Sequence, residues 1–205
     1  MKKKFLKTGK FLLTATLFLS LSLSVTNCSK DDDPAPVQPP VVLAPLQDPL
    51  AGFLTATGFS QKTTTKIDIG DYEFGFSFIP LVNGKMTAIV AKIPDTRLAM
   101  RVTVWDKVAG TVLRTETIDI ATTDVEVTKQ ITALDLVKDK EYFITFNSND
   151  WYRRSKTDNS AVTYPFTVGD IKITSYAYID GTTQTIPNFQ INTYYAGDCS
   201  FKFQK

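Results

Sequence analysis

Tyr72-Glu73-Phe74-Gly75-Phe76-Ser77-Phe78 alternates aromatic residues with small or polar ones. Successive side chains of an extended strand point to opposite faces, so the four aromatic side chains share one face. Pro80 ends the stretch, Asn83-Gly84 is a tight-turn signal, and residues 85–93 read as a returning strand. This part of the chain predicts a β-hairpin with one strongly aromatic face.

Short strand patterns separated by turn residues continue to the C-terminus. In residues 171–179 we expect the isoleucines on one face and Lys172, Tyr176 and Tyr178 on the other. No stretch has convincing helical periodicity, although residues 133–138 fit one short turn. Many short strands with regular turns predict an all-β fold, and we expect a jelly-roll-like β-sandwich over residues 50–205. Further strands are expected at 98–105, 111–120, 125–131, 141–147, 171–179, 191–195 and 199–203.

The first 27 residues have the layout of an export signal. Residues 1–10 carry five lysines and no acid, and residues 11–25 are uncharged and mostly apolar. The apolar run is shorter than the ~20 residues that span a bilayer. A buried amphipathic helix is the alternative, but the lysines lie only on the N-terminal side of the run. We therefore expect residues 1–27 to be a signal peptide.

A lone cysteine and an acidic run follow this signal. Val25-Thr26-Asn27-Cys28 resembles the lipobox of bacterial lipoproteins, in which the cysteine is acylated and becomes the new N-terminus. The next residues resemble the surface-export tag of Bacteroidota-type lipoproteins; they include Lys30, Asp31, Asp32 and Asp33. The resemblance implies a protein anchored in the outer membrane through Cys28 and facing the cell exterior. A free thiol, or a disulfide with Cys199, is the alternative for Cys28.

Residues 28–49 form the predicted tether, which is acidic at first and then rich in proline. Six prolines fall within residues 34–49, and such a segment favours extended conformations over a helix. Five of the 23 basic residues precede Cys28, so 18 basic and 21 acidic residues remain after cleavage, with a net charge of about −3. This charge gives no reason to expect a nucleic-acid partner.

The chain contains no histidine. Ser-His-Asp and Cys-His catalysis, histidine-ligated zinc and histidine-based pH switching are therefore excluded. If Cys28 is acylated, Cys199 has no partner for a disulfide, and we expect it to be a small buried strand residue.

Carboxylates are the remaining candidates for catalysis or metal binding. Paired carboxylates hydrolyse glycosides, but the aspartates here lie mostly in turns. Four glutamates lie in predicted strands and are candidates for positions that face solvent: Glu73, Glu116, Glu126 and Glu141. Two oxygen-rich loops have the ligand type of calcium but no defined calcium motif, namely residues 68–71 and 147–150. We expect both loops to be ordinary turns without a metal or other cofactor. We also expect that the protein is not an enzyme, with a carboxylate-dependent glycosidase as the lesser alternative.

Aromatic residues beside polar ones are the candidates for ligand binding. Aromatic rings with a polar rim bind sugars by stacking and apolar contact, and arginine pairs with the carboxylates of an acidic glycan or protein. Because Tyr194 and Tyr195 point to opposite faces, one of them is a candidate for exposure. The alternative is that these rings only pack in strands, where aromatic residues are enriched. The predicted ligand-binding residues are Trp151, Tyr152, Arg153, Tyr176 and Tyr178.

Val102-Thr103-Val104-Trp105-Asp106 precedes Gly110-Thr111-Val112-Leu113, and Tyr142 follows Leu136 through a charged turn. Over residues 72–151 this pattern resembles an uncharacterised jelly-roll domain family of bacterial surface proteins. The resemblance implies an accessory or surface module without a catalytic set. The leading hypothesis is a lipid-anchored, non-catalytic surface protein that binds a glycan or another macromolecule. A structural or adhesive lipoprotein with a protein partner is the alternative.

Overall fold

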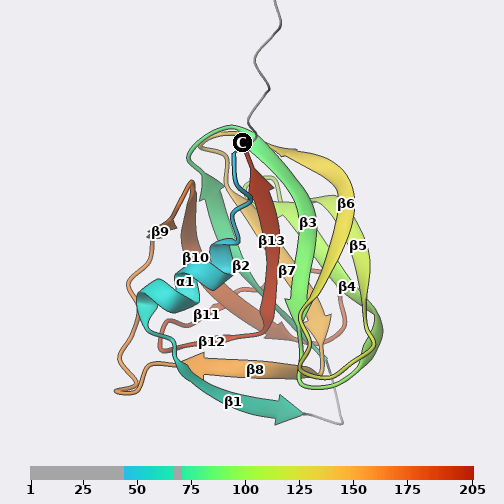
Figure 1. The fold of residues 1–205 in the computed structure, drawn as a ribbon, viewed down its shortest axis with the longest axis vertical. Coiled ribbons are helices and arrows are strands. Elements are labelled where there is room, and N and C mark those ends of the chain that lie inside the picture. Colours follow the sequence, from blue (N-terminus) through green and yellow to red (C-terminus); the bar gives the residue numbers. More distant parts are fainter. Residues whose placement is uncertain (1–43, 67–70) are drawn as a thin grey trace, which may run out of the picture. The chain divides into compact units, whose positions relative to one another are not determined.

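The computed structural model describes residues 44–66 and 71–205, which form an all-β sandwich with one short helix (Figure 1). The signal peptide, Cys28 and the export tag lie outside the described residues, as does most of the tether. Among the described helices none has the length and apolar character needed to cross a membrane.

The described strands form three antiparallel sheets. The largest sheet has the order β11 (Phe189–Gln190), β10 (Ile171–Asp180), β2 (Tyr72–Pro80), β7 (Tyr142–Ser148), β4 (Arg97–Asp106) and β5 (Thr111–Ile120), with β9 (Phe166–Val168) also pairing with β10. The opposite sheet has the order β13 (Asp198–Gln204), β3 (Gly84–Lys92) and β6 (Val127–Leu136). A third sheet, of β1 (Gln61–Lys66), β8 (Asp150–Ser155) and β12 (Tyr194–Ala196), runs crosswise at the lower end of Figure 1.

The strand pairs are nested in the manner of a jelly roll. β4 pairs with β5, β3 with β6, and β2 with β7, and these pairs alternate between the largest sheet and the opposite sheet. A two-stranded ribbon has therefore folded over on itself, which is the expected architecture.

The predicted hairpin of residues 72–93 is wrong, although both of its strands exist. β2 pairs with β10 and β7, whereas β3 lies in the opposite sheet and pairs with β13 and β6. The turn before Gly84 thus carries the chain from one layer of the sandwich to the other. Both strands are largely buried, and placing them in opposite layers lets each contribute one face to the core.

The aromatic face predicted for β2 is confirmed. Phe74, Phe76 and Phe78 are all buried in the core between the two larger sheets. Phe201 of β13 meets them from the opposite sheet, with its ring centroid 4.6 Å from that of Phe78 and 6.3 Å from that of Phe76. Aromatic contacts across the layers therefore hold the sandwich together.

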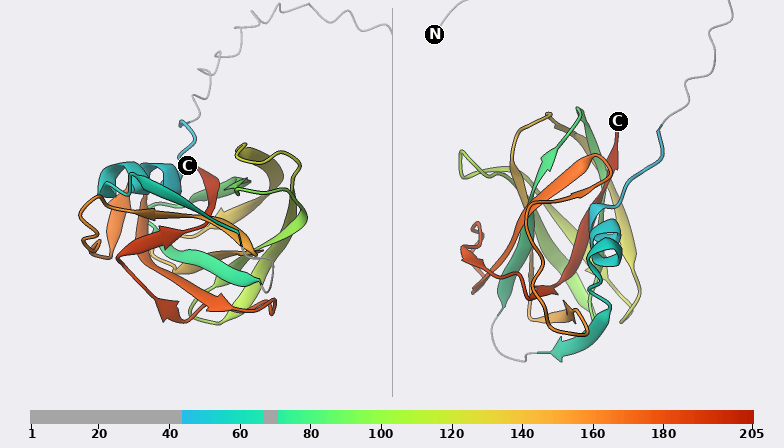
Figure 2. Two further views of the ribbon diagram at one scale, coloured as in Figure 1. Left: turned by 90° about the horizontal axis from the view of Figure 1, so that it is seen from below. Right: turned by 90° about the vertical axis from the view of Figure 1, so that its left-hand side faces the viewer.

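The helix α1 (Pro49–Thr57) was not predicted. Asp48 caps it by accepting a hydrogen bond from the Ala51 N–H at 3.1 Å, and Pro49 occupies the first turn, where its missing N–H costs nothing. Phe53 anchors the helix in the core, and α1 lies beside β13 in Figures 1 and 2. Pro49, the last proline of the predicted tether, is therefore the first residue of α1.

The sandwich includes residues that the sequence places in the tether. Gln47 forms two backbone hydrogen bonds with Phe203, of 2.9 and 2.8 Å. The Asp48 carboxylate accepts from the Lys202 ammonium at 3.0 Å and from the Ser200 hydroxyl at 2.6 Å. Residues before position 50 are therefore part of the folded unit.

Two local expectations about the later strands are also corrected. Residues 133–136 continue β6 rather than forming a helical turn.

In β10 the pairing register with β2 shifts between Ile173 and Ser175, which marks a β-bulge. The extra residue changes the phase of the alternation, so Tyr176 points into the core together with Ile171 and Ile173. The predicted opposition to the tyrosines is therefore wrong for Ile171 and Ile173, whereas it holds for Ile179, which pairs with Glu73.

The segment after β10 folds back over the outer face of the largest sheet. The Gln184 amide donates to the hydroxyls of Thr103, at 3.0 Å, and Thr115, at 2.7 Å. Ile186 packs against a small second cluster that lies on this face, made by Trp105, Phe143 and Ala177. We call residues 181–188 the strap. It explains why β2 and β7 are buried on both faces.

Candidate functional site

An aromatic cleft opens where the crosswise sheet meets the largest sheet. Its volume is about 270 Å³. It combines three of the five predicted ligand-binding residues with ring systems from two other elements. Its lining residues are Thr65, Tyr72, Phe74, Trp151, Arg153, Tyr178, Tyr194 and Ala196.

Strand β8 places Trp151 and Arg153 on the same side. The two residues are two positions apart, so their side chains share one face, while Tyr152 points to the other. β8 lies between β1 and β12, and Arg153 is paired with Thr63 on one side and Ala196 on the other. The backbone that carries both side chains is therefore fixed by neighbours on both edges.

Trp151 forms one wall of the cleft and is only partly exposed. Its ring centroid lies 4.8 Å from that of Phe74 and 5.2 Å from that of Tyr72, with inclined planes. Such edge-to-face and tilted contacts hold the indole in one orientation while leaving part of it open.

Two tyrosines form another part of the cleft wall. Tyr178, from β10, and Tyr194, from β12, have ring centroids 6.4 Å apart. Burial, together with a hydrogen bond with Tyr178, raises the pKa of Tyr194 above its usual value. Phe189, which is 55 % exposed, lies next to this wall with its ring 5.0 Å from that of Tyr178.

Tyr152 lies outside the cleft and is buried. Its hydroxyl donates to the Asp124 carboxylate at 2.7 Å, and the Lys62 ammonium lies 4.3 Å from its ring centroid. This hydrogen bond and the ammonium of Lys92 lower the pKa of Asp124 to about 2. Tyr152 therefore anchors a turn, since Asp124 adopts a left-handed backbone conformation there.

Tyr176 is also outside the cleft, because the bulge in β10 turns its side chain into the core. It is completely buried, and its ring centroid lies 4.7 Å from that of Tyr195 and 6.3 Å from that of Tyr194. Tyr176 thus supports the cleft from beneath. Of the pair at 194 and 195, Tyr194 is the partly exposed member and Tyr195 is buried.

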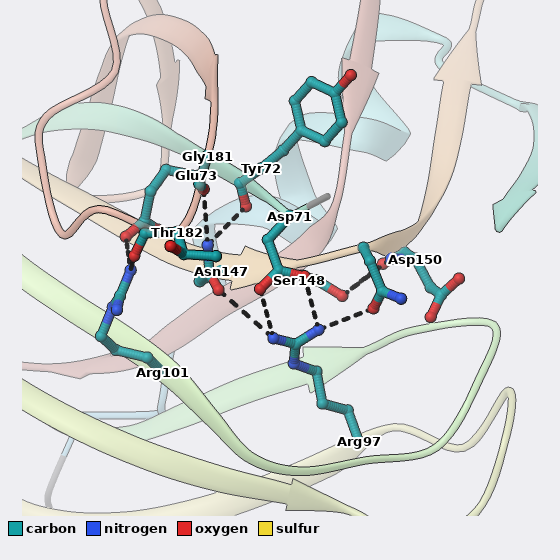
Figure 3. A network of polar contacts seen from close by, with 11 residues as sticks. Asp71, Tyr72, Glu73, Arg97, Arg101, Asn147, Ser148, Asp150, Gly181 and Thr182 are labelled. Carbon is teal, nitrogen blue, oxygen red and sulfur yellow. Dashed lines mark hydrogen bonds and ion pairs between the residues drawn. The ribbon is translucent and has the colours of Figure 1, made fainter. Parts of the chain in front are cut away.

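Asp71 and Asn149, one from each of the two oxygen-rich stretches that suggested calcium, both contact Arg97 (Figure 3). The Arg97 guanidinium pairs with both carboxylate oxygens of Asp71, at 2.9 and 3.2 Å, and donates to Asn149 at 2.8 Å. The Arg97 guanidinium therefore supplies the positive charge that these oxygens contact. Residues 68–70 lie outside the description. Within the described ranges no cluster of three or more acidic or cysteine side chains is arranged to hold a metal ion.

Glu73 belongs to the same region, and the expectation that it faces solvent is wrong. It is completely buried on the outer face of β2, where Arg101 donates to its carboxylate and also to the Thr182 carbonyl of the strap, at 2.8 Å (Figure 3). Its second oxygen is buried without a hydrogen-bond partner. Burial raises the pKa of Glu73 to about 7 even though Arg101 opposes this shift.

Tyr72 and Thr65 are among the cleft residues that were not selected from the sequence as ligand contacts. Tyr72 was assigned to the aromatic face of its strand, and that face is continuous with the cleft at its end. Thr65 comes from β1, whose run of lysines and threonines carries no strong strand pattern. No local signal identifies either of them, because only the crosswise packing of β8 brings them to Trp151.

Comparison of the chain with protein-family models, with curated proteins and with solved structures gives no match.

Proposed function

We propose that this protein is a lipid-anchored surface protein whose β-sandwich binds a glycan in the aromatic cleft. The observation that carries the proposal is the convergence of Trp151, Arg153 and Tyr178 on one cleft. Trp151 and Arg153 share one face of β8, and Tyr178 comes from β10, so two strands that are distant in sequence bring these three residues together. The partly open indole and phenol rings suit the apolar face of a sugar ring.

The proposed anchor is Cys28. Its acyl chains would hold the protein in the outer membrane, since two or three chains give stable attachment where one gives only marginal binding. The acidic run of Lys30 and residues 31–33 would direct the protein to the cell exterior. The prolines that follow would keep the sandwich clear of the membrane surface.

Replacing the cleft tryptophan tests the binding proposal. We expect the full-length protein, solubilised in detergent, to bind a related set of sugars on a glycan array. Trp151→Ala should weaken this binding by about tenfold or more, because the largest stacking surface of the cleft is lost.

Tyr152→Phe is the matched control, because it alters the neighbouring residue of the same strand outside the cleft and should keep full binding. Unfolding midpoints of both variants show whether they remain folded. A blank array with folded wild-type protein would contradict glycan binding and favour a protein partner.

The anchor has a separate test. Cys28→Ser should leave the protein without acyl chains, so it should move from the membrane fraction to the soluble fraction. The measurement is fractionation in high salt together with mass spectrometry of the N-terminal peptide. If the variant remains in the membrane fraction, Cys28 is not the anchor.

A further inference from the structure

We infer, on the basis of the proposed function, that the ligand of the aromatic cleft is an acidic sugar whose anionic group binds Arg153. The inference begins with the arginines. The chain has five arginines, and all of them lie in the described residues. Four are paired with carboxylates: Arg97 with Asp71, Arg101 with Glu73, Arg114 with Glu116, and Arg154 with Asp198.

Arg153 is the exception, since no described carboxylate lies within ion-pair distance of it. Its guanidinium carbon stands 4.3 Å from the ring centroid of Tyr194, so its described partner is an aromatic face. Stacking of this kind uses the flat face of the guanidinium and leaves the N–H groups at its edge available. Those groups form a fork that matches a carboxylate with two parallel hydrogen bonds.

The surroundings of Arg153 also favour an anion. Among the described residues that line the cleft, Arg153 is the one charged side chain, and no acid stands beside it. Its side chain is exposed, while its backbone is held in the middle strand of the crosswise sheet. A cation that is fixed in place and free of a carboxylate partner is preorganised for an incoming anion.

The size and lining of the cleft define the rest of the ligand. A space of about 270 Å³ lined by Trp151 and the two tyrosines fits a sugar ring rather than a folded protein surface. A sugar that offers an apolar ring face to the aromatics and a carboxylate or sulfate to Arg153 satisfies both parts of the site. A uronic acid is such a sugar, and so is a sulfated hexose.

The test uses pairs of sugars that differ only in charge. The full-length protein in detergent is titrated with an oligogalacturonide and its methyl ester, and with a sulfated galactan oligosaccharide and its desulfated form. We expect at least one charged member to bind about tenfold more tightly than its neutral partner, in line with charge-assisted hydrogen bonds. Which pair shows the difference separates a carboxylate from a sulfate ligand.

Arg153→Gln should reduce this preference to near unity while leaving binding of the neutral sugar. Lys62→Gln is the control, because it removes one positive charge from the same sheet outside the cleft and should keep the preference. Equal binding of charged and neutral members by the wild type would overturn the inference and leave glycan binding in place. If neither these sugars nor any sugar on the array binds, both the inference and the proposed function fail.

Discussion

Phe201→Ala should lower the free energy of unfolding by about 4 kcal/mol, within the range of about 3–5 kcal/mol found for buried phenylalanines. The side chain is completely buried in β13 and contacts Phe76 and Phe78 across the sandwich. Removing it leaves a cavity between two sheets, and the backbone of each sheet is fixed by the hydrogen bonds between its own strands. The core can therefore collapse only partly into the space, and both apolar burial and aromatic contact are lost.

Urea unfolding of the full-length protein in detergent measures this change. We expect the transition midpoint to fall while the dependence on denaturant stays the same, because the variant keeps the fold. Phe189→Ala is the matched control: the residue is the same, but it is 55 % exposed, and the expected loss is below about 1 kcal/mol. A loss below about 1.5 kcal/mol for Phe201→Ala would contradict the assigned packing between the sheets.

Stability should fall as the pH rises from about 4.5 to about 7, and Glu73 should be the cause. An unfolded chain loses the Glu73 proton near pH 4.5, whereas the folded protein holds it until about pH 7. Within this window the folded state binds the extra proton, so each step upward in pH favours the unfolded state. The contribution of Glu73 to stability is therefore largest below pH 4.5, and it is completely lost above about pH 7.

The expected size of this loss is of the order of 3 kcal/mol, from 1.36 kcal/mol for each pKa unit. The chain suits the measurement because it contains no histidine, which would otherwise titrate in the same window. Six other described carboxyl groups have a lowered pKa, which makes stability change with pH in the opposite direction. Unfolding in urea at pH values from 4.5 to 8 records the slope.

Glu73→Gln should make stability nearly independent of pH in this window. Glutamine resembles the protonated carboxyl, and its amide oxygen still accepts from Arg101. At pH 8 the variant should therefore be more stable than the wild type. Glu126→Gln, which removes an exposed carboxyl, should keep the wild-type slope. If both variants retain that slope, the pH dependence does not arise from the carboxyl buried beneath the strap.

The sequence predicted part of the cleft because part of it is local. Trp151 and Arg153 are two positions apart on one strand, and a period of two places them on the same side in any extended conformation. Tyr152, between them, is by the same rule on the other side, and its hydroxyl binds Asp124. The sequence did not show that this middle residue is buried, because the lysines and the turn that cover it come from distant segments.

Tyr176 and Tyr178 show the limit of alternation. Both were assigned to the face opposite Ile171 and Ile173, but all four point inward because the bulge inserts a residue between the two pairs. A bulge is defined by the partner strand as much as by its own residues. A single strand pattern therefore could not place these tyrosines, and one of them lines the cleft while the other lies beneath it.

Periodicity, composition and turn residues were sufficient for the all-β class, the aromatic face of β2 and the exclusion of histidine chemistry. Each of these depends on residues that are close in sequence or on a residue that is absent. The tertiary structure alone decided that β2 pairs with β10 and β7, that the strap covers Glu73, and that Trp151, Tyr178 and Tyr194 line one cleft. Pairing, burial and convergence depend on segments tens of residues apart, and their free energy is gained only when those segments pack together.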